Sequence, residues 1–263
     1  MLAGYSLRAE SMTQWRLPDR LNEISGLALD ADGRLFAVAD EAAIVYELDA
    51  DAGRIRRTFT FGAPALRGDF EGIAAVDGRV YLLTSDGHLV SGKVGEDGED
   101  LEYTEVDTGV GDECELEGLA RQPGRDVLLM ACKQLHRGHR LRDLSVFAWS
   151  LEQHALLPAA TVVVPVSDVL RRLRTDRLNP SGLAVDPASG HLVLLASRQH
   201  ALVELTAAGR LVGVAALPAA RHRQPEGIEF TADGRLLIAD EGGSHKARLG
   251  IYVRDRAAGG AEE

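Results

Sequence analysis

A three-residue phrase, Ser or Glu followed by Gly and then Leu or Ile, recurs five times and constrains the fold of this chain more than any other feature. The copies are Ser25-Gly26-Leu27, Glu71-Gly72-Ile73, Glu117-Gly118-Leu119, Ser181-Gly182-Leu183 and Glu226-Gly227-Ile228. Successive copies begin 46, 46, 64 and 45 residues apart. A repeat of this length is typical of solenoids and propellers, in which each unit packs against its neighbours. The chain therefore reads as five structural units of similar design.

Each unit contains short strand patterns separated by turn sequences. In the first unit, apolar runs lie at 24–30, 34–39 and 44–48, and an alternating run follows at 54–61. Sequences rich in Asp and Gly separate these runs, as expected of tight turns. Four short strands in a unit of this length predict one propeller blade. Helical periodicity is nearly absent, which argues against parallel strands joined by helical crossovers.

The five units predict an all-β fold, a five-bladed β-propeller with four antiparallel strands per blade, formed by residues 1–263 as a single domain. The last unit runs out of chain after its third strand, at 249–254. We expect residues 1–17 to supply its outer strand, which would close the ring of blades and remove exposed sheet edges. The long third interval predicts a short inserted helix over 167–178, capped by Ser167 or Asp168.

Composition and charge narrow the class of protein. The chain has 263 residues, is 45% hydrophobic and carries a formal net charge of −11, which speaks against a nucleic-acid binder. We recognise neither an apolar run long enough for a membrane helix nor a signal peptide. We therefore expect a cytoplasmic protein, or a periplasmic one if a leader has been removed. Cys114 and Cys132, the only cysteines, are expected to be reduced core residues. The oligomeric state is not indicated.

Propeller topology brings the loops before each repeat and the ends of the second strands to one rim of the channel. The first two units bring mainly acids to this rim, and the last three add bases. Candidate general bases at the ends of second strands are Asp40, Asp86 and Asp240. Candidate anion-binding residues on the same rim are Lys133, His136, Arg137 and Arg198. A mouth with an acidic and a basic side predicts a small anionic ligand.

The first residue of each repeat is expected to face the channel axis. These five positions are Ser25, Glu71, Glu117, Ser181 and Glu226. Three carboxylates at close range raise one another's pKa unless a cation neutralises them. Ca²⁺ suits such a set because it accepts roughly six to eight oxygen ligands in flexible geometry. None of the five positions is His or Cys, which argues against zinc or copper. The alternative is structural: the polar residue begins the inner strand and bonds a neighbouring blade.

At these repeats the chain resembles the SdiA-regulated family of bacterial β-propellers. The phrases that carry the resemblance are Leu21-Asn22-Glu23-Ile24-Ser25-Gly26-Leu27, Asp69-Phe70-Glu71-Gly72-Ile73, Leu116-Glu117-Gly118-Leu119, Asn179-Pro180-Ser181-Gly182-Leu183 and Gln224-Pro225-Glu226-Gly227-Ile228. The resemblance implies a propeller fold, a calcium site and no established activity. The family includes exported and membrane-anchored members, and we see no N-terminal anchor in this chain.

A more distant likeness concerns only the five axial positions. Their order, Ser, Glu, Glu, Ser, Glu, is similar to the central calcium ring of five-bladed calcium-dependent apyrases, which hydrolyse nucleoside di- and triphosphates. The rest of the chain does not read like an apyrase, so the likeness implies a site and not a substrate.

Three functions are compatible with these features. We favour a non-catalytic ligand-binding module with a metal at the channel mouth, because propellers host many unrelated functions. The alternative is a calcium-dependent hydrolase of phosphate-bearing or ester substrates, in which the metal acts as a Lewis acid. A metal-dependent lactonase of the six-bladed kind is a weaker third possibility, because the chain has only five repeats.

Overall fold

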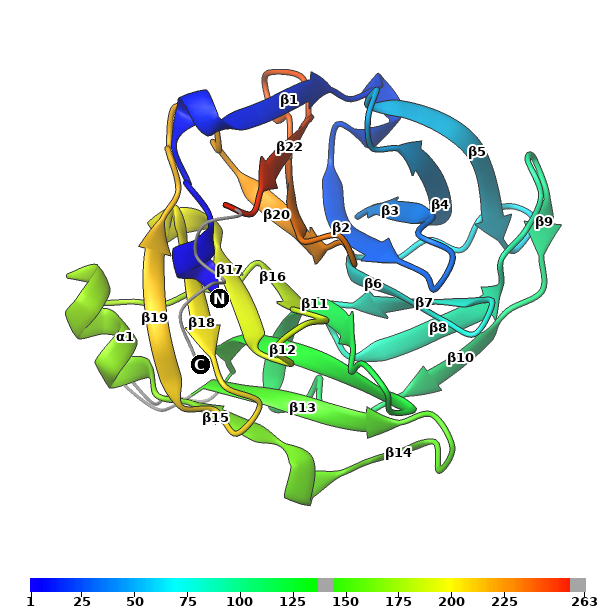
Figure 1. The fold of residues 1–263 in the computed structure, drawn as a ribbon. Helices are drawn as coiled ribbons and strands as arrows, with labels where there is room; N and C mark the ends of the chain where they lie inside the picture. The colour runs from blue at the N-terminus through cyan, green and yellow to red at the C-terminus, as the bar shows by residue number, and fades with distance from the viewer. Residues whose placement is uncertain (137–143, 256–263) are drawn as a thin grey trace.

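The computed structural model describes residues 1–136 and 144–255, and five blades surround a central channel (Figure 1). The innermost strands of the blades are β2 (Ile24–Leu29), β6 (Phe70–Val76), β11 (Cys114–Arg121), β16 (Gly182–Val185) and β20 (Pro225–Phe230). Each inner strand contacts the inner strands of both neighbouring blades, so the five form a closed ring. The predicted five-bladed, all-β propeller is confirmed.

The other strands follow in sequence order from the axis outward, and neighbours within a blade pair antiparallel. The first two blades add β3 (Leu35–Ala39), β4 (Ala42–Asp49) and β5 (Arg54–Phe61), then β7 (Arg79–Thr84), β8 (His88–Lys93) and β10 (Thr104–Asp107). The third and fourth add β12 (Val127–Leu135), β13 (Leu144–Ser150), β14 (Ala155–Leu156) and β15 (Val162–Val164), then β17 (Leu192–Ala196), β18 (Ala201–Leu205) and β19 (Leu211–Ala216). The fifth adds β21 (Arg235–Asp240) and β22 (Arg248–Val253).

Two sheets depart from the simple four-strand pattern. Strand β9 (Asp100–Leu101) comes from the second unit but pairs in parallel with β5 of the first blade. The outer edge of the third blade is divided between β14 and β15, and both pair with β13. The loop that carries β9 therefore links the first two blades at their outer edges.

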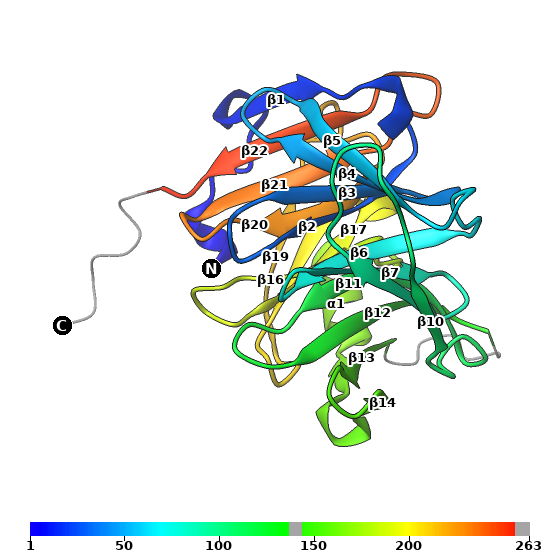
Figure 2. The same ribbon diagram turned by 90° about the vertical axis from the view of Figure 1, so that its right-hand side faces the viewer.

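The N-terminal segment closes the ring of blades. Strand β1 (Met12–Arg16) pairs antiparallel with β22, in a register that runs from Met12 opposite Tyr252 to Arg16 opposite Arg248. Figure 2 shows β1 beside β22 at the edge of the fifth blade. The predicted origin of this outer strand is confirmed, although only part of residues 1–17 is strand. Short 3-10 turns cover Leu2–Gly4, Ala9–Ser11 and Asp19–Leu21, with two more at Pro158–Ala160 and Ser197–Gln199.

The inserted helix is present but shorter than predicted. Helix α1 (Val166–Leu173) begins directly after Pro165, which is its N-cap residue, and no side chain caps it. The predicted cap by Ser167 or Asp168 is therefore wrong, because the helix starts too early for either residue. It lies against β19 on the outside of the fourth blade (Figure 1). No helix within residues 1–136 and 144–255 is long and apolar enough to cross a membrane.

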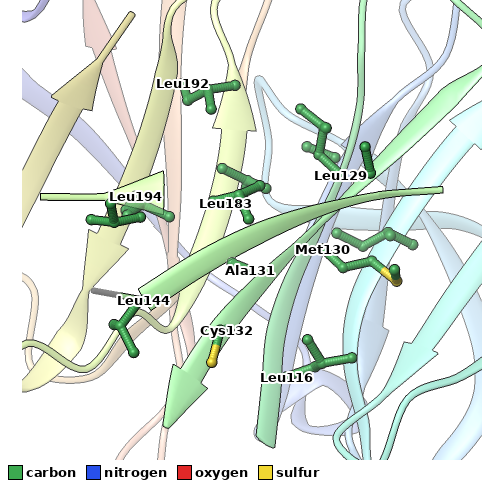
Figure 3. Packing of buried hydrophobic residues seen from close by; sticks show 14 of the residues in the cluster. Leu116, Leu129, Met130, Ala131, Cys132, Leu144, Leu183, Leu192 and Leu194 are labelled. Atoms are coloured by element: carbon green, nitrogen blue, oxygen red, sulfur yellow. The ribbon is translucent and has the colours of Figure 1, made fainter. Parts of the chain in front are cut away.

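The largest hydrophobic cluster joins the second, third and fourth blades. Leu129 and Met130 of β12 pack in the same cluster as Leu183 of β16 and Leu194 of β17 (Figure 3). All four side chains are almost completely buried. Burial of apolar surface stabilises a fold by roughly 25 cal/mol per Å². This packing between blades therefore holds the inner strands at fixed positions around the channel. The channel residues described below therefore project from a rigid frame.

The two cysteines form a disulfide, so the expectation that they are reduced is wrong. Cys114 lies in β11 and Cys132 in β12, with their Cα atoms 5.8 Å apart. The pairing of these strands explains the bond, because Cys114 lies opposite Leu135 while Cys132 lies opposite Leu116, two residues further along β11. Spacing along the sequence could not reveal this diagonal neighbourhood across the two strands.

We expect reduction of this disulfide to lower the free energy of unfolding by about 3 kcal/mol, because it frees a closed loop in the unfolded chain. The bonded residues are 18 apart in the sequence. Urea unfolding with and without a reductant measures the difference. A variant with Cys114→Ala and Cys132→Ala is the control, and its stability should not respond to the reductant. Two free thiols in the native protein, detected by mass spectrometry after alkylation, would contradict the bond.

The glycine of each repeat lets inner strands of neighbouring blades approach closely. A Cβ atom on Gly118, whose φ is +96°, would lie 2.6 Å from the backbone nitrogen of Leu183 in the next blade. We expect Gly118→Ala to cost at least about 2 kcal/mol in urea unfolding, from strain and from this clash. Gly213→Ala is the matched control, because a Cβ there meets nothing within 4 Å. Equal stability of the two variants would contradict the close approach.

Candidate functional site

The five axial residues lie at one end of the channel, where the inner strands begin. In four of the five blades, a bulge interrupts the pairing of the inner strand with the second strand at this end. The bulge falls at the first residue of the repeat, which is Ser25, Glu71, Glu117 or Glu226. A bulge leaves the extra residue outside the hydrogen-bonded ladder and redirects its side chain. Ser181 precedes the first residue of β16. We call these five residues the axial ring and this end of the channel the ring face.

The three carboxyls of the axial ring influence one another through their charges, and none has its ordinary acidity. Burial and the neighbouring charge of Glu117 raise the pKa of Glu71 to about 9. The same two causes raise the pKa of Glu226 to about 8. Burial raises the pKa of Glu117 only to about 6, because Lys133 stabilises its ionised form. At neutral pH, Glu71 and Glu226 are therefore largely protonated, and the negative charge of the ionised Glu117 is offset in part.

The ammonium group of Lys133 supplies that partial offset. Its Nζ contacts Oε1 of Glu117 and lies 3.0 Å from Oε1 of Glu115. These two carboxylates raise the pKa of Lys133, so it stays charged. Lys133 was predicted as a ligand-binding base on the rim, whereas the structure places it as the internal counter-ion of the axial ring. It reaches the ring because it is the extra residue of a bulge in β12, between the pairs Glu115–Gln134 and Leu116–Cys132.

The two hydroxyls of the ring join backbone groups. Ser181 Oγ donates to the carbonyl of Pro225 in the fifth blade at 2.8 Å and accepts from the Ser197 amide at 3.2 Å. Ser25 Oγ donates to the carbonyl of Val38 at 3.4 Å. Ser181 thus connects two blades, which is the structural role that the sequence left open as an alternative. After these hydrogen bonds, each hydroxyl oxygen keeps at least one lone pair that could coordinate a cation.

The donor set fits a hard cation in its chemistry, since all five side chains offer oxygen. The present arrangement is not a closed coordination sphere: within residues 1–136 and 144–255, no three His, Cys, Asp or Glu side chains are close enough to share one metal ion. The ammonium group of Lys133 contacts Oε1 of Glu117, an oxygen that a shared metal would use. A cation shared by the ring would therefore have to replace this ammonium group.

Asp40, one of the three candidate bases, lines a cavity of 450 Å³ at the ring face of the first blade. Burial and the neighbouring carboxylates of Glu23 and Asp69 raise its pKa. Its Oδ1 is buried and has no hydrogen-bond partner among the described residues. A half-buried carboxyl with an unused oxygen is suited to proton transfer. The same cavity also contains Arg67, which pairs with Glu41 at 3.2 Å.

The other two candidate bases are already committed to hydrogen bonds. Asp86 is exposed and accepts from Thr84 at 2.5 Å, and this bond together with that from His88 lowers its pKa. Asp240 is buried and lies 2.8 Å from Nδ1 of His222, whose Nε2 is 2.8 Å from the Tyr252 hydroxyl. A general base must reach water or substrate, and Asp40 combines such access with a raised pKa.

Of the predicted anion-binding residues, Lys133 is the one that pairs with a carboxyl of the axial ring in the described part of the chain. Arg198 lies in the 3-10 turn after β17 and is exposed, and His136 is exposed at the end of β12. Arg137 lies outside the described residues. Asp69 and Glu115, which lie two residues before Glu71 and Glu117 in the sequence, also raise the pKa of carboxyls in the ring.

Comparison with known proteins agrees with the fold. The model of the family described as SdiA-regulated matches residues 6–242. No curated protein matches the chain in sequence. Similar solved structures include a Myxococcus xanthus glutaminyl cyclase, with TM-score 0.58, 16% identity and coverage of 91% of this chain and 93% of that chain. A streptogramin B lyase has TM-score 0.53, 13% identity and coverage of 92% and 97%, respectively.

A gluconolactonase from Xanthomonas campestris is a further match, with TM-score 0.50, 18% identity and coverage of 87% of this chain and 72% of that chain. These three proteins carry different activities, and their identities to this chain are low. The likeness therefore concerns the propeller fold alone.

Proposed function

The chain belongs to the SdiA-regulated family, and we propose that it is a calcium-binding β-propeller whose ring face serves as a non-catalytic ligand-binding module. The observation that carries the proposal is the axial ring of three buried carboxyls. Two of them have their pKa raised to about 9 and about 8, and one lysine is their nearby counter-ion among the described residues. Such a set gains free energy when a divalent cation replaces the bound protons and the lysine.

The residues that would hold the cation are Glu71, Glu117 and Glu226, with Ser25 and Ser181 as further oxygen donors. When bound, calcium supplies a positive centre that accepts the anionic oxygen of a small ligand. The chain's own contribution is the rigid frame of five inner strands and the exclusion of bulk water from the buried ring. The ring face is acidic in the described residues around Glu23, Asp40 and Asp69, so an anionic ligand would depend on the metal.

A second candidate function, a calcium-dependent hydrolase, is favoured by one observation. Asp40 is a half-buried carboxyl with a raised pKa and an unused oxygen, and it faces a cavity at the same end of the channel. In a hydrolase this carboxylate would accept the proton of the attacking water. The substrate would be a phosphate-bearing compound or an ester.

The disulfide adds an argument about location. Bonds between cysteines persist in oxidising compartments and are rare in the cytosol. Cys114 and Cys132 are joined in this structure, so we propose the periplasmic alternative rather than the cytoplasmic one.

Calorimetric titration of calcium into protein freed of metal by a chelator tests the proposal. We expect a single binding event, a higher melting temperature, and no release of phosphate from nucleotides or product from generic esters. Calcium-restored hydrolysis that Asp40→Asn abolishes, with calcium affinity unchanged, would instead favour the hydrolase. If calcium changes neither the melting temperature nor the heat signal, the ring is structural and the calcium proposal is wrong.

A further inference from the structure

The channel has a second mouth, at the opposite end of the inner strands. A cavity of 490 Å³ lies there, lined by the last residues of four inner strands and the turns that follow them. Leu29 ends β2, Arg121 ends β11, Val185 ends β16, and Glu229 precedes the last residue of β20. The axial ring lies at the first residues of the same strands. We call this end of the channel the turn face. The length of an inner strand separates its cavity from the axial ring.

Most of the charged groups that line the turn-face cavity are paired with each other or with neighbouring residues. Asp30 accepts from Arg34 at 2.7 Å. Arg235 lies 2.8 Å from Asp51 and 3.3 Å from Asp233. These side chains therefore have little free charge to offer a ligand. They instead fix the turns that form the cavity wall.

Two charged groups in the cavity are different. Arg121 is half-buried, its Nε is buried and has no hydrogen-bond partner, and within the described residues no carboxylate lies within 4 Å of its guanidinium. Glu229 is half-buried and has no cation within that distance in the same part of the chain. An unpartnered buried donor and an unpaired charge are both unfavourable, and a ligand carboxylate on the guanidinium would supply the missing charge partner.

The backbone holds the Glu229 carboxyl in place while leaving it able to bind. Its Oε2 accepts from the Leu29 amide at 3.1 Å, and its Oε1 accepts from the Phe230 amide at 2.8 Å. Each oxygen has a second lone pair that can accept a donor from a ligand. Burial raises the pKa of Glu229 to about 7. A positively charged group placed beside it would favour the ionised form.

Much of the cavity wall between these charged groups is apolar. Leu29, Ala120, Val185 and Phe230 line it together with Pro123 and Pro187. Cavities that bind small molecules usually combine an apolar wall with a few polar groups that fix orientation. Here the two charged groups without an ion-pair partner among the described residues, Arg121 and Glu229, have opposite charge and are not paired with each other. The complementary molecule carries a carboxylate and an ammonium group on a small apolar body.

We propose that the turn-face cavity binds a zwitterionic amino acid or short peptide, with its carboxylate on the guanidinium of Arg121 and its ammonium group on the carboxyl of Glu229. The guanidinium offers a planar fork of donors that matches a carboxylate. Glu229 accepts the N–H donors of the ammonium group. This site lies at the opposite end of the channel from the axial ring and does not depend on calcium.

Isothermal titration of four probes into the full chain tests the site. L-leucine, γ-aminobutyrate and the dipeptide Leu-Leu carry both charges at different separations, and leucinamide lacks the carboxylate. We expect at least one zwitterion to bind and leucinamide not to bind. Arg121→Met should weaken that binding by about tenfold to a hundredfold, and Glu229→Gln should weaken it by about tenfold. The titrations are repeated in a chelator. The affinity for the zwitterion should be unchanged there, whether or not calcium binds the axial ring, so the outcome for this site is independent of the calcium proposal.

Arg125→Met is the matched control, because Arg125 lies in the same turn but is exposed and does not line the cavity. Its affinity for the zwitterion should equal that of the wild type. If Arg121→Met does not fold, Arg121→Lys keeps the charge and should lose a smaller factor while Glu229→Gln still reports on the site. Failure of all three zwitterions to bind the wild type overturns the proposal. Equal binding to wild type and Arg121→Met, or equal binding of leucine and leucinamide, overturns it as well.

Discussion

In the presence of a chelator, the free energy of unfolding falls by several kcal/mol as the pH rises from about 5 to about 9. Glu71, Glu226 and Glu117 have folded-state pKa values of about 9, 8 and 6, against an ordinary value of 4.5. In this window the folded chain holds more protons than the unfolded chain, so raising the pH favours unfolding. Each pKa unit corresponds to about 1.4 kcal/mol, reduced where the carboxyl is partly exposed. Urea unfolding at a series of pH values measures the fall.

Saturating calcium should remove most of this fall, because a bound cation stabilises the ionised carboxylates. Glu229 provides an internal control: its pKa of about 7 and its place at the turn face predict a smaller loss of stability near neutral pH in both media. An unchanged stability from pH 5 to 9 in chelator would contradict the electrostatics of the axial ring. An equally large fall in calcium would contradict calcium as the counter-ion.

The repeats were sufficient for the architecture because each unit is one blade. Counting them predicted five sheets, and the last unit running short predicted that the N-terminal segment would pair with β22. Details that depend on one loop were less accessible. Helix α1 begins directly after Pro165, where a proline fixes the backbone without a side-chain cap, and β9 crosses to a neighbouring blade for two residues only. Such short elements leave no periodic pattern.

The axial positions followed from the repeat, whereas their partners did not. Lys133 reaches Glu117 because the pairing of β11 and β12 is irregular at that point, and a bulge cannot be read from spacing. Asp240 looked like a rim acid because it ends a second strand. It is buried because His222, from the loop before β20, packs onto it. The irregular pairing of β11 and β12 also brings Cys132 next to Cys114. Sequence predicts which strands neighbour each other better than it predicts their exact register.

The turn face went unnoticed in the sequence for a related reason. Arg121 and Glu229 belong to different blades and are separated by 108 positions. Neither lies in the repeated phrase, and each looks like an ordinary charged residue near a turn. Their significance comes from what does not contact them in the described structure, which only packing reveals. Asp30 and Asp233 are similar residues in equivalent turns, yet both are paired.

Replacing Glu71 by Gln should change stability in opposite directions with and without calcium. In chelator at pH 8, the wild-type carboxyl must take up a proton to fold, since its pKa is about 9 in the folded chain and near 4.5 when unfolded. Gln keeps the shape and has no such cost, so Glu71→Gln should be more stable than wild type by a few kcal/mol. In calcium the same change removes a ligand, and affinity should fall by about tenfold or more.

Glu105→Gln is the matched control, because Glu105 is exposed on β10 of the same blade and belongs to no ion pair among the described residues. It should leave both stability and calcium affinity unchanged. If Glu71→Gln destabilised the protein equally in both media, Glu71 would be a structural hydrogen-bonding residue and not a ligand. The reversal of sign is decisive because loss of packing lowers stability in every medium. Only a carboxylate that is unfavourable alone and favourable beside a cation produces opposite effects.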